Sequence, residues 1–110
     1  MTTSMIDNLE AMLAKGQDNA MLRFGLGKAY YQNNDYVTAC EHLQQAVQYK
    51  PEYTAAWKLL GFCQQQLDQL QQALHTYQQG IVAAQTEGDK QAEKEMQVFV
   101  KKINKRLAQG

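Results

Sequence analysis

The stretch that decides the fold is AAWKLLGFCQQQL, residues 55–67. It contains no proline and no run of β-branched residues, so it predicts a helix, yet Gly61 lies in its middle. A glycine inside a helix costs about 1 kcal/mol relative to alanine. Glycine at this place therefore indicates that another part of the chain approaches the helix too closely for a side chain.

An earlier segment repeats this pattern at a fixed offset. The pair Leu26-Gly27 matches Leu60-Gly61 at an offset of 34 (61 − 27 = 34). Small or apolar residues recur at the same spacing, namely Ala39 with Ala73, Leu43 with Tyr77, Ala46 with Gly80 and Tyr36 with Leu70. A period of this length is typical of arrays of one supersecondary unit. The sequence therefore predicts two complete units, 20–53 and 54–87.

Each unit divides into two predicted helices that form a hairpin. In the first unit the break lies at Asn34, which can adopt the left-handed conformation that ends a helix, and Pro51 closes the second helix. In the second unit the helices cover about 54–67 and 70–86, with the break near Asp68.

Further helices flank the two units. Leu9 precedes Leu43 by one period, so 5–15 is interpreted as the second helix of an incomplete preceding unit. Residues 89–109 form one long amphipathic helix that we expect to cap the array, at the place of a third unit's first helix but with a few inserted residues. Its apolar stripe consists of Ala92, Met96, Phe99, Val100, Ile103 and Leu107. The whole chain, 1–110, is thus predicted to be a single all-α domain.

These residues resemble the tetratricopeptide repeat (TPR) family, whose pattern is W-x2-L-G-x2-Y followed by Ala, an aromatic residue, Ala and Pro. The second unit carries Trp57, Leu60, Gly61, Ala73 and Tyr77, and the first carries Leu26, Gly27, Tyr30, Ala39, Leu43, Ala46 and Pro51. Three places depart from the pattern: Arg23 stands where Trp57 does, Gln64 where Tyr30 does, and Gln85 where Pro51 does. The whole resembles small bacterial single-domain TPR proteins. The resemblance implies a short right-handed α-solenoid of antiparallel helix hairpins.

The resemblance also gives a reason for the glycines. Gly27 and Gly61 are expected where the two helices of a hairpin cross, with Ala39 and Ala73 facing them from the second helices. A side chain at the crossing would push the helices apart, and close packing offsets the local propensity cost.

Composition limits the classes of partner and compartment. The chain has 11 basic and 11 acidic residues, so its net charge of zero argues against a general nucleic-acid binder. The N-terminus lacks the basic and apolar regions of a signal peptide, and no segment approaches the roughly 18 apolar residues of a membrane span. Cys40 and Cys63 belong to no CxxC motif and are expected to be buried in a reducing compartment. A cytoplasmic protein without membrane contact is expected.

The sequence contains no motif that indicates catalysis. His42 and His75 fall on the second helices, and the sequence shows neither a nucleophile nor a carboxylate placed to orient them. Phosphate-binding GxxxxGK[ST], HExxH and paired Cys-His ligand motifs are missing from the sequence. We therefore expect no enzyme activity, no cofactor and no metal.

The expected binding surface is the concave one, which in the family is lined by first helices and holds peptide segments. The residues expected there are Met21, Phe24, Lys28, Tyr31, Gln32, Lys58, Phe62, Gln65 and Gln66, with Ala55 beside them. Exposed aromatic side chains along a groove would form an interaction surface. An alternative stays open, in which Phe24 and Phe62 pack only between adjacent first helices.

Charge sorts by helix although the total is zero. The first helices, 20–33 and 54–67, carry Arg23, Lys28 and Lys58 and no acid, and the segment from Asp89 carries six bases and three acids. The sum is +6 (3 + 6 − 3), so the rest of the chain carries −6. We therefore predict a basic inner wall and a preference for acidic peptides.

The expected function is non-catalytic binding of an unidentified protein or peptide in the groove. Self-association is one alternative, in which the first or last helix stacks on another copy to give a homo-oligomer or scaffold. A helical-repeat RNA binder is a second alternative, against which the period of 34 and the zero net charge weigh.

Overall fold

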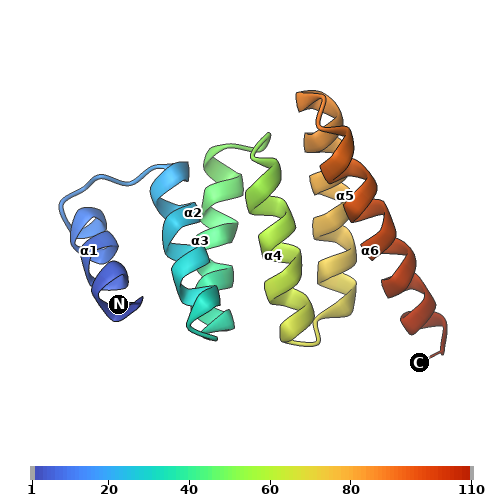
Figure 1. Cartoon of the computed structure of the whole chain (residues 1–110), viewed down its shortest axis with the longest axis horizontal. Helices are drawn as coiled ribbons and strands as arrows, with labels where there is room; N and C mark the ends of the chain where they lie inside the picture. The colour runs from blue at the N-terminus through green and yellow to red at the C-terminus, as the bar shows by residue number, and fades with distance from the viewer. Residues whose placement is uncertain (1, 110) are drawn as a thin grey trace.

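The computed structural model describes residues 2–109, which contain six α-helices and no strand (Figure 1). The helices are α1 (Thr2–Ala14), α2 (Ala20–Gln32), α3 (Tyr36–Tyr49), α4 (Thr54–Gln66), α5 (Leu70–Glu87) and α6 (Lys90–Gln109). They follow one another in a row, with α1 at one end and α6 at the other (Figure 1). The predicted all-α solenoid is confirmed. The division into units 20–53 and 54–87 stays a prediction.

The turns between helices use the residues that the sequence pattern indicated. Asn34 and Asp68 have left-handed backbones with φ of 63° and 59°. Asp35 caps α3 by accepting a 3.3 Å hydrogen bond from the amide of Thr38. Gly88, with φ of 71°, ends α5. These local signals set where each helix stops, and hence the length of each wall of the solenoid.

The helices of each hairpin cross closely at a glycine, as predicted. A Cβ atom at Gly27 would lie 2.5 Å from Leu43 Cγ, and one at Gly61 would lie 2.3 Å from Tyr77 Cε1. Ala39 also reaches the crossing, with its carbonyl oxygen 3.3 Å from the Cβ position at Gly27, although Leu43 and Tyr77 make the shortest contacts. Leu43 and Tyr77 come one turn after Ala39 and Ala73. Helical side chains lean toward the N-terminus, so they cover the crossing.

Two apolar clusters form the core. One lies between α2, α3 and α4 and includes Leu43, Leu60 and Cys63, and the other lies between α5 and α6 and includes Tyr77 and Met96. The predicted burial of both cysteines is confirmed, with Cys40 and Cys63 exposing 8% and 0% of their surface.

The last helix, α6, packs its predicted apolar stripe against α5. Ala92, Met96 and Ile103 are buried, and Phe99 packs on the same cluster. Phe99 also contacts Phe62, with the two ring centroids 5.3 Å apart, so α6 lies beside α4 as well. None of the helices in the described chain combines the length and the apolar character that a bilayer span requires.

Candidate functional site

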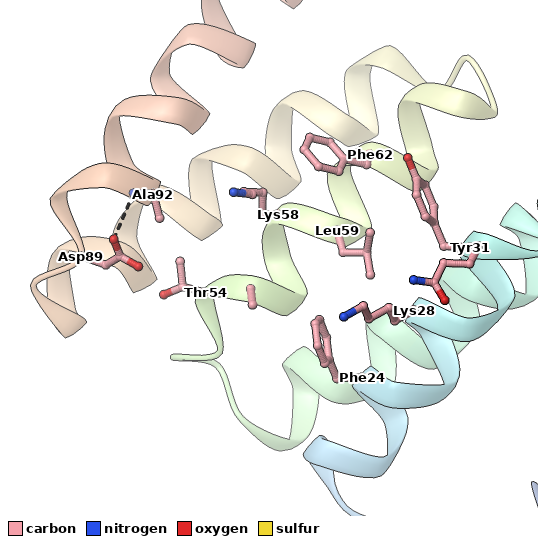
Figure 2. Close-up of a pocket in the computed structure, with 11 residues that line it drawn as sticks. Phe24, Lys28, Tyr31, Thr54, Lys58, Leu59, Phe62, Asp89 and Ala92 are labelled. Carbon is pink, nitrogen blue, oxygen red and sulfur yellow. Dashed lines mark hydrogen bonds between the residues drawn. The ribbon is translucent and has the colours of Figure 1, made fainter. Parts of the chain in front are cut away.

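A groove runs between α2 and α4 and reaches the beginning of α6 (Figure 2). Its cavity measures about 450 Å³. The lining residues are Phe24, Lys28, Tyr31, Gln32, Thr54, Ala55, Lys58, Leu59, Phe62, Asp89 and Ala92. The groove is thus an apolar channel with a few charged groups at its edges, the form that ligand sites commonly take.

The structure brings most of the predicted site residues together. Of these, Phe24, Lys28, Tyr31, Gln32, Lys58 and Phe62 line the cavity. Gln65 and Gln66 line a smaller adjoining hollow of about 230 Å³, which shares Tyr31 and Phe62 with the main groove. Met21 lies in neither hollow and is 77% exposed. That these residues bind a peptide stays a prediction.

Sequence reasoning did not place four lining residues in the groove. Leu59 and Thr54 belong to α4, while Asp89 and Ala92 belong to the junction before α6 and to α6 itself. Asp89 caps α6 by accepting a 3.0 Å hydrogen bond from the amide of Ala92, which fixes the carboxylate at the groove (Figure 2). The signal for Asp89 is its position just before α6, where an aspartate commonly caps a helix.

The two groove phenylalanines are held by aromatic neighbours. The Phe24 ring centroid is 5.1 Å from that of Tyr53, and the Phe62 centroid is 5.3 Å from that of Phe99 and 6.3 Å from that of Tyr77. Both phenylalanines are half-buried and still line the cavity. Each ring therefore packs against its neighbours and presents its remaining surface to the groove. Helix packing and an exposed groove surface, the two alternatives that the sequence left open, are thus both present.

The charge of the groove differs from the sequence prediction. Lys58 Nζ lies 2.7 Å from Glu95 Oε1, and this contact with the lysine holds the pKa of Glu95 below its usual value. The first helices carry no acid, as predicted, but the predicted basic wall is neutralised at Lys58. The prediction counted only acids on the first helices, whereas α6 places Glu95 beside α4. Within residues 2–109 no ion pair involves Lys28, which is exposed.

Glutamines on α4 hold the wall of the groove in place. Gln65 accepts a hydrogen bond from the hydroxyl of Tyr77. The neighbouring Gln64 is buried and accepts a 2.6 Å hydrogen bond from Thr76 Oγ1. Gln64 stands where the family pattern has a tyrosine. Its buried amide is hydrogen-bonded between α4 and α5, and without such a partner its burial would cost free energy.

A polar cluster, missed at the sequence level, joins α1, α2 and α3. Arg23 makes two hydrogen bonds to the carboxylate of Asp18, at 2.8 and 2.9 Å, and its Nη1 lies 3.1 Å from His42 Nδ1. The Arg23 guanidinium, together with the hydroxyl of Tyr49, lowers the pKa of Asp18 to about 2. The signal was the departure at Arg23, since an arginine in an apolar place calls for a carboxylate partner.

The same cluster corrects the interpretation of His42. Its Nε2 lies 3.9 Å from Glu10 Oε2, so a carboxylate does approach this histidine, and its ring stacks on Tyr30 with centroids 5.5 Å apart. Tyr30 in turn donates a 2.6 Å hydrogen bond to Glu10. Burial and the neighbouring Arg23 lower the pKa of His42, which favours the neutral ring. These contacts tie α1 to the first hairpin; His75, by contrast, is exposed.

Comparison with known proteins gives the family. Residues 4–80 match the family model described as anaphase-promoting complex, cyclosome, subunit 3. A TPR repeat-containing protein of Pseudomonas aeruginosa is 54% identical over 101 residues, which cover 92% of this chain and 96% of that protein. The chain belongs to the tetratricopeptide repeat family. TPR domains are typically non-catalytic protein-interaction modules.

Solved structures agree with this TPR assignment. The solution structure of a Bordetella parapertussis protein is 40% identical, covers 92% of this chain and 88% of that one, and has a TM-score of 0.78. A TPR domain protein from Salinibacter ruber is 26% identical, with 78% and 87% of the two chains covered and a TM-score of 0.72. The TPR2B domain of yeast Sti1, at 13% identity and a TM-score of 0.82 over 92% and 81% of the chains, shows the fold alone.

Proposed function

We propose that this TPR chain is a non-catalytic module that binds a peptide segment of another protein in the groove between α2 and α4. The observation that carries the proposal is the cavity of about 450 Å³, lined by aromatic and aliphatic side chains with lysines among them. Two proteins of the same fold support it, because their solved structures hold ligands of this kind. The Sti1 domain is in a complex with pHsp70, and the first TPR of RPAP3, 22% identical to this chain, is bound to the HSP90 peptide SRMEEVD.

Apolar anchors supply the affinity in this proposal. Phe24, Leu59 and Phe62 line one continuous hollow, and Tyr31 joins it to the adjoining smaller one. A hollow of this size accepts one or two apolar side chains of a peptide. Because Phe24 and Phe62 are already fixed by aromatic neighbours, little side-chain entropy is lost when the peptide binds.

The charge preference in this proposal is for an acidic segment, and it rests first on Lys28. Lys28 lines the groove without an ion-pair partner among the described residues, so a peptide carboxylate meets a free ammonium group there. Lys58 contributes only when the peptide carboxylate displaces Glu95. An exposed ion pair is worth about 1 kcal/mol or less, which corresponds to about fivefold in affinity. Added salt should weaken the binding.

A peptide array followed by calorimetric titration of the best hits tests the proposal. Lys28→Glu should weaken an acidic hit by about fivefold, because the ion pair is lost and like charges repel, whereas Lys102→Glu, an exposed control on α6 outside the groove, should leave it unchanged. Glu95→Gln should strengthen the same hit because it frees Lys58. Hits that are basic or neutral, or equal binding by Lys28→Glu and its control, would refute the acidic preference. If Phe62→Ala weakens none of the hits, the groove is refuted as the binding site.

We also propose that the chain acts in the cytoplasm. Its two cysteines are buried and free, as suits a reducing compartment. The sharpest check is the fractionation of cells that express the natural protein.

A further inference from the structure

The first helix exposes an apolar face that is covered in the complete hairpins. Met5, Leu9 and Met12 each come one repeat period before Ala39, Leu43 and Ala46. The three residues of α3 are fully buried, and Leu43 packs at the crossing with α2. On α1, however, Met5 is 52% and Met12 is 41% exposed. In the described chain, α1 is thus a second helix without the first helix that would cover this face.

The last helix, α6, is instead a first helix without a second helix of its own unit packed against it in the described chain. Ala92 and Met96 are buried like Ala56 and Leu60, and each follows its counterpart at an offset of 36 (92 − 56 = 96 − 60 = 36). Helix α6 therefore stands where a first helix would, with two inserted residues relative to the period of 34. In this register Gln97 corresponds to Gly61, the residue of α4 that meets α5.

A hollow marks the place where the missing second helix would pack. It measures about 530 Å³ and is lined by Ile81, Lys94, Gln97, Val98, Val100 and Lys101. Ile81 comes one repeat period after Val47, which is buried beneath the second hairpin, and Val98 is 47% exposed. Over residues 2–109 no helix covers this hollow. The face of α6 around Gln97 is thus a first-helix face without its second helix.

The two open faces are both apolar. Met5 and Met12 are exposed on α1, and Ile81, Val98 and Val100 line the hollow on α6. The acids of α1 lie on other sides of that helix, because Glu10 is bonded to Tyr30 and Asp7 is about 200° around the helix from Met5. The two faces lie on the end helices of the row (Figure 1). The exposed methionines of α1 fit a hollow with an apolar floor, and α1 cannot reach the hollow on α6 within the same solenoid.

We propose that α1 of a second copy docks in the hollow on α6, so that the two helices form a third TPR hairpin across the contact. The contact joins two different surfaces, so it leaves one free face at each end and continues head to tail. Each added copy would also place its α2 after the α6 of the previous one and so lengthen the row of first helices that lines the groove.

Two double variants separate this arrangement from any other self-association. Met5→Lys with Met12→Lys blocks the α1 face, and Val98→Glu with Lys101→Glu blocks the α6 face. All four side chains are exposed, so the fold should be retained, and thermal melting checks this. In sedimentation velocity, the parent mass should rise above 12.5 kDa over about a hundredfold range of concentration.

Each double variant alone should remain a monomer, because it retains only one of the two complementary faces. An equimolar mixture should form a complex of twice 12.5 kDa and nothing larger. Val37→Glu, on α3 and 59% exposed, is the control and should associate as the parent does. A parent that stays monomeric throughout, a double variant that still associates by itself, or a mixture that does not combine would each overturn the proposal.

Discussion

The substitution Gly61→Ala should destabilise the protein although it improves local helix propensity. A Cβ atom at this position would lie 2.3 Å from Tyr77 Cε1, 2.5 Å from Cζ and 2.8 Å from Cδ1. Comfortable carbon contacts are roughly 3.5–4.0 Å long. Tyr77 is fully buried, its ring touches Phe62 and Phe99, and its hydroxyl is bonded to Gln65. The ring therefore has no free direction in which to move.

The expected size of the effect follows from two opposing terms. Overpacking a core site costs about 1–3 kcal/mol. A contact that is too short by more than about 1 Å against a fixed ring should cost about 3 kcal/mol, the upper end of that range. Replacing glycine by alanine in a helix returns about 1 kcal/mol. The net loss is about 2 kcal/mol. At about 4 °C per kcal/mol for a chain of this size, the melting temperature should fall by about 8 °C.

Gly25→Ala is the matched control on α2. A Cβ atom at Gly25 would meet only Leu9, at 3.8 and 4.0 Å, so the gain of about 1 kcal/mol in propensity should remain. Circular dichroism melts and urea titrations of both variants measure the difference. If Gly61→Ala melts at or above the parent, as Gly25→Ala should, the close crossing at Tyr77 is refuted.

Three further changes probe other contacts. Deleting α6 should cause unfolding or aggregation, seen as a collapsed NMR spectrum, because α5 loses its apolar cover; a well-dispersed monomer would contradict this. Cys40 and Cys63 should react slowly with a thiol reagent in the native state and fast in denaturant, since both are buried; rapid native labelling would place them outside the core. Asp18→Asn should lower the melting temperature at neutral pH. The Asp18 carboxylate has a depressed pKa in the fold, so its contribution is present above pH 3.8 and lost as the pH falls through about 2. The variant and the parent should therefore converge in acid, and a constant difference would contradict the pairing with Arg23.

The helices and their order were predictable because short-range signals determine them. The period of 34, the left-handed residue Asn34 and the proline at Pro51 each mark a helix or its end within the local sequence. Helix α1 begins at Thr2 instead of the predicted residue 5 and ends at Ala14, one residue before the prediction. Residues 2–4, TTS, are all of types that favour helix starts, so they offer no single start signal.

The charge of the groove was not predictable from the sequence pattern alone. Whether Glu95 meets Lys58 depends on the rotation of α6 about its axis, and two inserted residues turn that helix by about 200° relative to the period of 34. The cluster of Asp18, Arg23 and His42 also depends on contacts between a loop and two helices. Periodicity gives the face of each helix but not the partner that a long charged side chain reaches.

The same position of the TPR repeat holds Trp57 in the second hairpin and Arg23 in the first, and the two side chains make different kinds of contact. In the second hairpin Trp57 packs near Gly80 and donates a 2.7 Å hydrogen bond to the carbonyl of Pro51. In the first hairpin the same place holds Arg23, which turns to Asp18 and His42. Because α1 brings Glu10 to the same cluster, polar contacts add to the apolar packing of α1, whereas α6 buries an apolar stripe and adds the Lys58–Glu95 ion pair. An α1 tied down by polar contacts keeps Met5 and Met12 on its free face, which is the face that a second copy needs.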